Sequence, residues 1–295
     1  MRFHKLFVCL LIATSFLMIT ACGGGGGGGS NPSGEVTMSI TDAKPLLPEG
    51  AKNITNLFIT FTGISVHKSG GGWISLPMAE DPPHTIDLLQ FINRNTTEIV
   101  PPFLLEYGKY TQIRLKIESA KIRFDDDPNT DSPVIIPPAY LKVDENFIFD
   151  VNEPKPIDII IDFDLSQSLI VTDSFGKPLY NLNPVLHIVR ATEAATITGE
   201  IDKGSFILGQ NAQMTVYAPN PYFPGTYKEY TKIEISDSGT DPTEFGIYWL
   251  VPNQVYSVEI DFDPDLDNGI EFSENVSSYD LKSGKTWYLN SGTPI

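Results

Sequence analysis

Cysteine is scarce in this chain of 295 residues, which contains only Cys9 and Cys22. Cys9 lies in an apolar leader that we expect to be removed, so the mature chain would keep one thiol. No disulfide can then form within the mature chain, although export would permit one. The remaining thiol is expected to carry lipid, as the residues before it indicate, and this excludes a free cysteine nucleophile.

Basic residues are also few: 20 Lys and Arg stand against 37 Asp and Glu, for a formal net charge of −17. That balance opposes binding to a polyanionic phosphate backbone, so the sequence predicts no nucleic acid partner. The hydrophobic content of 41% is nevertheless sufficient to build buried cores and excludes a disordered chain.

Histidine is rare as well, and only His67, His84 and His187 follow the leader. The sequence has no Gly-x-Ser-x-Gly and no His-Glu-x-x-His motif, so the templates of serine and zinc hydrolases lack their parts. We therefore predict that the protein is not an enzyme. An envelope enzyme that acts on polysaccharide or peptide through paired carboxylates is the alternative, although the 37 acidic residues single out no pair.

Residues 1–21 have the pattern of a bacterial export signal. Arg2 and Lys5 form a basic start, and residues 6–18 form an apolar run that is shorter than the ~20 residues needed to span a bilayer. Residues 19–22 read Ile-Thr-Ala-Cys, which resembles the lipobox of bacterial lipoproteins. The resemblance implies cleavage before Cys22 and acylation of its thiol and new amino end. An ordinary secretory peptide with an incidental cysteine is the alternative.

Residues 22–34 are predicted to be a lipidated cysteine followed by a tether. Seven glycines follow Cys22, and the next five residues are Ser, Asn, Pro, Ser and Gly, a composition that builds no core. Fully extended, such a stretch reaches about 45 Å. Gly23 in place of Asp resembles lipoproteins sorted to an outer membrane. We expect the protein in the bacterial cell envelope, held to a membrane by its N-terminal lipid.

From Glu35 onward, apolar and polar residues alternate with a period of two, which is typical of half-buried strands. Examples are residues 36–40, 113–117 and 157–163. The one helix expected is short, over residues 85–93, because 23 prolines would interrupt longer ones. Many short strands without helical crossovers predict an all-β fold of antiparallel sheets, packed as sandwiches with little helix.

The strand pattern pauses near residues 191–195 and then restarts. We therefore predict two β-sandwich domains, one over residues 35–193 and one over residues 194–295. The second, at about 100 residues, has the size of a seven-stranded sandwich of the immunoglobulin type.

Residues 35–190 contain a series of ordered motifs. They are SITDA at 39–43, VH at 66–67, GGGW at 70–73, TIDLL at 85–89, GKYTQIRL at 108–115, IDFD at 161–164 and LNPV at 182–185. This order resembles a bacterial lipoprotein family known only as domain of unknown function number 4382. The family has no established activity, so the resemblance implies no catalytic residues.

The second domain carries ITGEI at 197–201, VYA at 216–218 and GIYWLVP at 246–252. These segments are similar to transthyretin-like (prealbumin) and carboxypeptidase-regulatory-like sandwiches. The resemblance implies an accessory or binding domain.

Residues 263–274 can be aligned with a twelve-residue calcium loop. The ligands would be the side chains of Asp263, Asp265 and Asp267, the carbonyl of Gly269 and the carboxylate of Glu274. Asn268 stands where such a loop has Gly, and the residues before it form a strand pattern rather than a helix. Calcium is the one cofactor that the sequence suggests, and an acidic solvated loop is the alternative.

Other chemically notable residues have simpler interpretations. The acidic stretch 125–131 is interpreted as a solvated turn, and His187 as a satisfied histidine of a sheet. Asp158, Asp162 and Asp164 alternate along one strand and predict a polar sheet face. Aromatic residues that could stack on a sugar or a peptide are Trp73, Tyr217, Tyr222, Phe223, Tyr227 and Tyr230. Packing in the core is their default role.

Taken together, these patterns predict a lipid-anchored envelope protein that acts as a non-enzymatic binding or scaffold module. Its expected partners are a membrane, through the lipid, and a glycan or a protein. A carboxylate-dependent enzyme and a calcium-stabilised adhesin are the two alternatives.

Overall fold

The computed structural model describes residues 31–43, 53–92, 94–136, 141–142, 149–152, 155–206, 211–264 and 269–295. The chain divides into two compact units, Met1–Asn31 and Pro32–Ile295, and nearly all described residues belong to the second. The predicted signal peptide and Cys22 lie outside the described residues. No helix within the described ranges is long and apolar enough to cross a membrane.

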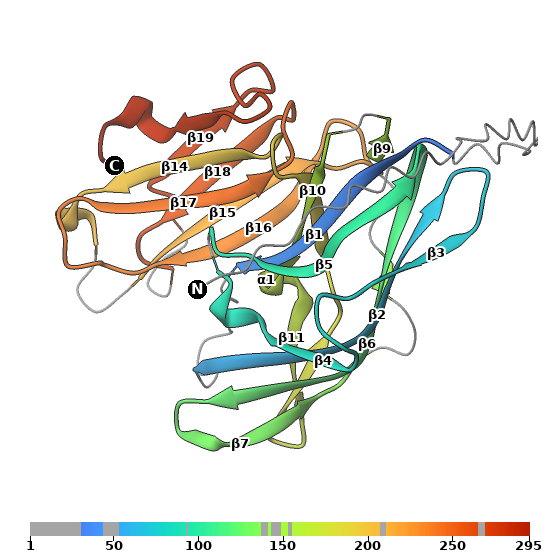
Figure 1. Cartoon of the computed structure of the whole chain (residues 1–295). Helices are drawn as coiled ribbons and strands as arrows, with labels where there is room; N and C mark the ends of the chain where they lie inside the picture. The colour runs from blue at the N-terminus through green and yellow to red at the C-terminus, as the bar shows by residue number, and fades with distance from the viewer. Residues whose placement is uncertain are drawn as a thin grey trace, which may run out of the picture. The chain divides into compact units, whose positions relative to one another are not determined.

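Two sheets share the first hydrophobic core (Figure 1). One sheet has the order β13-β10-β1-β5, and the other has β3-β2-β6-β7 with β4 beside β2 and with β8 and β9 beside β6. The first sheet comprises β1 (Ser33–Ala43), β5 (Thr97–Glu106), β10 (Ile157–Asp164) and β13 (Leu186–Arg190). The second comprises β2 (Ile54–Lys68), β3 (Trp73–Leu76), β4 (His84–Asp87), β6 (Gly108–Phe124), β7 (Asp127–Val134), β8 (Leu141–Lys142) and β9 (Phe149–Val151).

The core forms because alternate residues of these strands point inward. In β2, Leu57, Ile59 and Phe61 are buried while the residues between them remain partly exposed. Met38 of β1 and Ile159 of β10 belong to the same buried cluster. The period-two pattern of the sequence therefore corresponds to one buried and one solvated face of each sheet.

The helix expected over residues 85–93 is wrong. The chain forms β4 there, followed by one turn of 3-10 helix, η1 (Leu88–Gln90). Thr85 and Ile86 pair with β2, and both are β-branched residues that suit a strand. Asp87 fixes the end of the strand, because its Oδ1 accepts a hydrogen bond of 3.0 Å from the Leu57 amide.

A hairpin and a short helix follow β10. The helix α1 (Leu165–Ser168) leads into the hairpin of β11 (Leu169–Ser174) and β12 (Lys177–Leu182). Asp164 caps α1, since its Oδ1 accepts from the amide of Gln167. Asp is a preferred residue at this position because its side chain satisfies an otherwise free helix amide.

A second hydrophobic core follows, beginning at Ala195. Its two sheets have the orders β17-β14-β20 and β16-β15-β18-β19. The elements are β14 (Ala195–Ile201), η2 (Lys203–Ser205), β15 (Ala212–Pro219), β16 (Tyr227–Ile235), β17 (Thr243–Leu250), β18 (Tyr256–Asp261), β19 (Phe272–Val276), β20 (Thr286–Tyr288) and η3 (Leu289–Gly292).

The prediction of an all-β, sandwich-like fold with little helix is confirmed. Most strand pairs are antiparallel, but β1 pairs with β10 in parallel, and so does β14 with β20. All buried residues of the first core precede the predicted boundary at residue 193, and all those of the second core follow it. The division into two independently folding domains stays a prediction.

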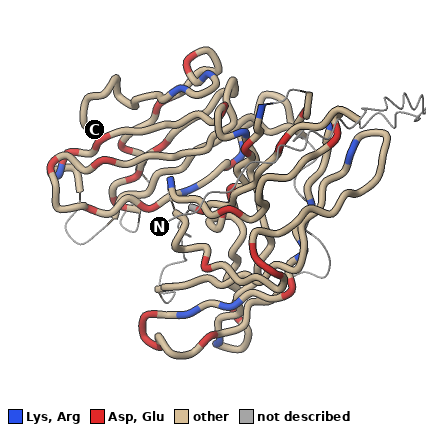
Figure 2. Tube along the Cα trace, viewed as in Figure 1, with Lys and Arg blue, Asp and Glu red and all other residues tan. Residues whose placement is uncertain are grey.

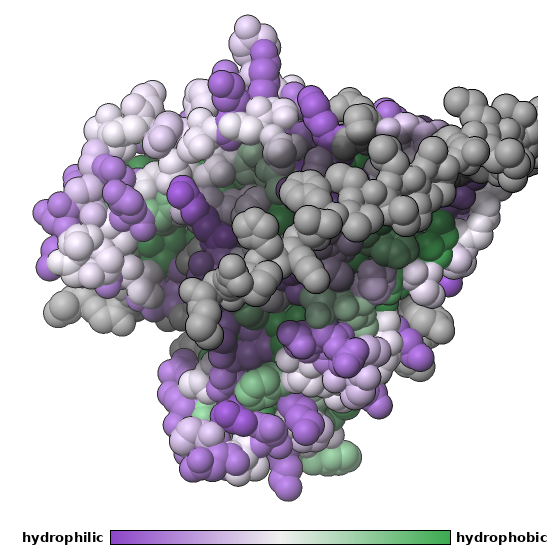
Figure 3. Space-filling view, viewed as in Figure 1, coloured by the Kyte–Doolittle hydropathy of each residue, from purple (hydrophilic) through white to green (hydrophobic). Residues whose placement is uncertain are grey.

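The surface has no single chemical character. On the face seen in Figure 3, hydrophobic residues gather in patches bordered by hydrophilic ones. Figure 2 shows acidic residues at the tip of the β6–β7 hairpin, and basic residues lie along β6. The charged residues are therefore unevenly distributed, so the electrostatic potential of a single cleft can differ from that of the whole chain.

Candidate functional site

A cleft of about 630 Å³ lies on the solvated face of the β2, β3 and β6 sheet. Its floor and rim contain the hydroxyl side chains of Thr62, Ser65 and Ser75, and its cations are Arg114 and Lys116. Trp73 lines the same cleft, and an apolar wall is formed by Leu76, Pro77, Met78 and Pro82. A volume of this size is within the range of ligand-binding sites, which is roughly 300–1,000 Å³.

Strand register brings these side chains together. Ser65 of β2 lies opposite Ser75 of β3 on one side and opposite Arg114 of β6 on the other. The next row places Gly63 opposite Lys116. Because Gly63 and Ser65 are small, the middle strand leaves a hollow between its neighbours. The long side chains of β6 can then extend over β2.

Arg114 uses that space to lie over Trp73. The guanidinium carbon is 3.5 Å from the centre of the Trp73 ring, and the ring of His67 is 5.3 Å from the Trp73 ring. Stacking on an aromatic face holds a guanidinium in one plane and keeps its N–H donors in a fixed fork. Trp73 is consequently a support for the Arg114 cation rather than an open stacking platform.

The sequence-based calcium ligands are only partly described. Asp265 and Asp267 lie outside the described residues, whereas Asp263, Gly269 and Glu274 lie within them. Glu274 of β19 is engaged elsewhere: its Oε1 accepts from the Trp287 indole, and its Oε2 accepts from the Asn290 amide, both at 2.7 Å. The calcium loop at 263–274 stays a prediction.

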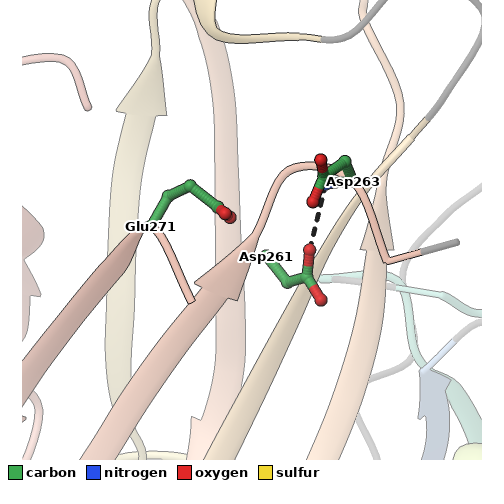
Figure 4. Close-up of side chains that lie close together, drawn as sticks. All are labelled: Asp261, Asp263 and Glu271. Carbon is green, nitrogen blue, oxygen red and sulfur yellow. Dashed lines mark hydrogen bonds between the residues drawn. The ribbon is translucent and has the colours of Figure 1, made fainter. Parts of the chain in front are cut away.

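A group of acidic residues that overlaps this loop, and shares Asp263 with the predicted ligands, does converge. One carboxylate oxygen from each of Asp261, Asp263 and Glu271 lies within 4.8 Å of the others, and Figure 4 shows Glu271 pointing toward the two aspartates. Two main-chain hydrogen bonds hold them: the Phe262 amide donates to Glu271 at 2.8 Å, and the Asp263 amide donates to Asp261 at 3.0 Å. Carboxylate oxygens are the ligands that calcium prefers.

The predicted polar sheet face on β10 is wrong for Asp164, which is 0% exposed. Its Oδ2 lies 3.5 Å from Nε2 of His187, and the same nitrogen contacts the carbonyl of Tyr230 at 3.1 Å. The rings of His187 and Tyr230 stack with centroids 4.0 Å apart. Asp164 caps α1. Its buried side chain therefore has a structural role and does not contribute to a solvated sheet face.

Asp162 lies directly opposite His187 in the β10–β13 pair. Burial raises the pKa of Asp162 to about 7; the nearby His187 lowers this pKa, and the charge of Asp164 adds to the rise. Asp162 and Asp42 line a cavity of about 30 Å³, which has room for about one water molecule.

The remaining predicted features have structural roles. The acidic stretch 125–131 forms the turn and first residues of the β6–β7 hairpin, where Asp131 pairs with Arg123 at 2.8 Å. Tyr222 and Phe223 are exposed, but Tyr230 is buried. Tyr230 therefore belongs to the core rather than to a surface platform, which agrees with the default for aromatics.

Sequence reasoning identified Trp73 and missed Arg114 and Lys116. Trp73 lies more than 40 positions before the other two residues, and it meets them only through the pairing of β2 with both β3 and β6. The available signal was the small residues Gly63 and Ser65 inside an otherwise bulky strand, because glycine in a strand often marks a site where something approaches closely.

The family model described as Domain of unknown function (DUF4382) matches residues 33–184, which include the motifs of the first core and the whole cleft. The chain belongs to the DUF4382 family. The match ends just before β13, so the second core of this DUF4382 protein lies beyond it. No curated protein matches the chain.

Three solved structures similar to this DUF4382 protein have low scores. A leucine-rich repeat protein from Bacteroides thetaiotaomicron is 10% identical, with 89% of this chain and 26% of that chain covered and a TM-score of 0.21. The fimbrial anchor protein Mfa2 from Porphyromonas gingivalis is 13% identical, with 84% of each chain covered and a TM-score of 0.21. A DUF3823 family protein from Bacteroides ovatus is 9% identical, with 84% of this chain and 100% of that chain covered and a TM-score of 0.15. Scores this low leave the function to be argued from the residues.

Proposed function

We propose that this protein is a lipid-anchored, non-enzymatic binding module of a bacterial cell envelope, and that it binds its ligand in the cleft of β2, β3 and β6. The observation that carries the proposal is the arrangement of Arg114 over Trp73 above a floor of small residues. Binding sites combine an apolar wall with a few well-placed polar groups. The cleft has both.

The anchor rests on residues 19–22 and on the tether after them. Several acyl chains on Cys22 would exceed the two signals required for stable membrane attachment. Without Arg2 and Lys5 of the leader, 18 basic residues would stand against 37 acidic ones, a net charge of −19. A body so acidic is repelled by anionic head groups, so the tether would hold it away from the lipid surface. Gly23 favours an outer membrane.

Mass spectrometry of the mature N-terminus tests the anchor. We expect a chain that begins at an acylated Cys22 and a Cys22→Ser variant that leaves the membrane fraction. A mature N-terminus elsewhere, or an unmodified thiol at Cys22, would overturn the anchor and leave a secreted protein.

The non-enzymatic part of the proposal is supported by the surroundings of one acidic pair on β10, Asp162 and Asp164. Asp162 lines a cavity of about 30 Å³, and Asp164 is 0% exposed. A glycosidase needs space for a sugar between its two carboxylates. A hydrolysis screen on polysaccharides and peptides tests this inference, and turnover that Asp162→Asn abolishes would overturn it.

The binding role is tested by filling the cleft without removing any of its polar groups. A Cβ added at Gly63 meets no heavy atom within 4 Å, so Gly63→Val should fold while its methyl groups occupy the floor. Gly204→Val is the matched control, because Gly204 has equally open surroundings and lies in η2.

An array of glycans and peptides is then probed with the three proteins. We expect the wild type and Gly204→Val to retain the same compounds, and Gly63→Val to lose them. Equal retention by all three proteins, or no retained compound at all, would overturn the proposal.

A calcium-stabilised adhesin is the second candidate function. It is favoured by the convergence of the carboxylates of Asp261, Asp263 and Glu271 within 4.8 Å. A cation there would fix the loop after β18, and its effect on stability separates this candidate from a metal-free binding module.

A further inference from the structure

We infer that the cleft selects an acidic sugar, and that Arg114 binds the carboxylate of a uronic acid residue. This inference rests on the proposed binding role of the cleft and adds the chemical class of its ligand. It is carried by the charge of the cleft, the fixed plane of the guanidinium, and the hydroxyl and apolar groups around it.

The charge of the cleft is opposite to that of the whole chain. The protein carries a net charge of −17, yet the charged residues among the described lining are Arg114 and Lys116, both basic. Elsewhere in the same sheet, Lys68 pairs with Glu106 at 2.9 Å and Arg123 pairs with Asp131 at 2.8 Å. A positive cleft on an acidic body attracts an anion to this one place.

The guanidinium is arranged for a planar anion. Arg114 lies with its carbon 3.5 Å from the Trp73 ring centre, so its plane is held before a ligand arrives. A carboxylate matches the two parallel N–H donors of such a fork, and fixing the fork in advance lowers the entropy lost on binding. Lys116 is exposed on the same strand and adds a second, mobile positive charge.

The remaining lining suits a sugar ring. The hydroxyls of Thr62, Ser65 and Ser75 can donate to and accept from the hydroxyls of a sugar. Met78 and Pro82 belong to the wall and offer an apolar surface to the C–H face of a ring. A uronate residue combines these three features, namely one carboxylate, several hydroxyls and an apolar face.

A peptide fits the cleft less well. Extended peptides bind sheets by adding a strand to a free edge, where they pair with main-chain groups. Here the cleft lies on a face of the sheet, and Ser65 is paired on both sides, with β3 and with β6. The main chain of the floor is therefore used within the sheet, and only side chains are offered to the ligand.

Titration calorimetry on the purified full chain tests the inference with three matched probes: the trimer of galacturonic acid, the trimer of galactose, and triglutamate. The first two differ in the carboxylates, and the third carries carboxylates without a sugar. The variants are Arg114→Lys, which keeps the charge but loses the fork, and Gly63→Val, which fills the floor. Lys121→Ala is the control, because Lys121 is an exposed cation of β6 outside the cleft.

We expect the galacturonic acid trimer to bind the wild type and Lys121→Ala with equal affinity. Arg114→Lys should weaken this binding by about tenfold or more, as loss of a charge-assisted hydrogen bond does. Gly63→Val should abolish it. The circular dichroism and melting temperature of each variant are measured alongside, so that loss of binding is separated from loss of the fold.

Three results would contradict the acidic sugar. Equal binding of the galactose trimer, unaffected by Arg114→Lys but lost in Gly63→Val, would overturn the ligand class and leave the binding role intact. Binding of triglutamate in place of the uronate would do the same. Binding of the uronate that neither Arg114→Lys nor Gly63→Val changes would overturn both the ligand class and the cleft.

Discussion

The indole N–H of Trp287 donates a hydrogen bond of 2.7 Å to Oε1 of Glu274, while the amide of Asn290 donates to the other oxygen of the same carboxylate. Through these two hydrogen bonds, the Glu274 side chain of β19 connects to both β20 and the start of η3. The two oxygens are used for structure, which is a different role from the calcium ligand that the sequence pattern suggests for Glu274.

Replacing Glu274 with Ala should therefore destabilise the protein whether or not calcium is present. Two charge-assisted hydrogen bonds are lost and the Trp287 N–H loses its partner, so we expect the free energy of unfolding to fall by about 1–3 kcal/mol. Urea unfolding measures the change. Glu244→Ala, which removes an exposed acid of β17, should change stability by less than about 0.5 kcal/mol. Equal effects of the two variants would contradict the structural role.

Calcium is expected to act through Glu271 rather than through Glu274. At the ~10⁻⁴–10⁻³ M affinity of extracellular calcium modules, millimolar calcium adds about 0.4–1.4 kcal/mol to the free energy of unfolding. We expect calcium to raise the melting temperature of the wild type relative to chelator, and to leave that of Glu271→Gln unchanged. Glu274→Gln should keep the calcium response. A rise of equal size in Glu271→Gln would remove the group of Asp261, Asp263 and Glu271 from consideration.

Strand positions could be predicted from the sequence because burial alternates with the period of the backbone. Val36, Met38 and Ile40 are all buried in β1, as their spacing predicts. The alternation does not predict which strand pairs with which. The parallel pairing of β1 with β10 joins residues about 120 positions apart, such as Val36 and Ile157, and no local pattern carries that information.

The same limit explains why the cleft was only half predicted. Trp73 stands out beside three glycines, but Arg114 becomes its neighbour only because β2 pairs with β3 and β6 in one particular register. The inward turn of Asp164 was missed for a related reason. Its burial is linked to α1, because its side chain caps the Gln167 amide of that helix, and a four-residue helix leaves too short a pattern to recognise.

The stability of the wild type relative to Asp162→Asn should fall as the pH rises from about 5 to 8. Burial raises the pKa of Asp162 to about 7, with His187 opposing and Asp164 adding to the rise. An unfolded aspartate ionises near pH 3.9. Between these two values the folded chain holds one proton more than the unfolded chain, so raising the pH favours unfolding.

Urea unfolding of both proteins across this pH range measures the difference, which should be on the order of 2 kcal/mol after allowance for partial exposure of the side chain. Asparagine cannot ionise, so the variant removes this contribution and keeps the background of all other groups. Parallel pH profiles for the two proteins would show that Asp162 has an ordinary pKa.

Two glycines in strands are expected to respond oppositely to alanine. A Cβ at Gly199 of β14 would lie 2.6 Å from Cζ of Phe245, a ring that is 8% exposed and belongs to the second core. A Cβ at Gly63 of β2 meets no heavy atom within 4 Å. Overpacking in a core costs about 1–3 kcal/mol, whereas alanine at an open position reduces the entropy of the unfolded chain and stabilises by about 0.4–1 kcal/mol.

We therefore expect Gly199→Ala to lower the urea midpoint and Gly63→Ala to leave it equal or higher. The conflict at Gly199 is with one ring, so a double variant of Gly199→Ala with Phe245→Leu should lose less stability than the sum of the two single variants. That coupling identifies contact with Phe245 as the cause, because residues that share no contact have additive effects. Additive effects at Gly199 and Phe245, or equal midpoints for Gly199→Ala and Gly63→Ala, would contradict the close approach of β14 to the Phe245 ring.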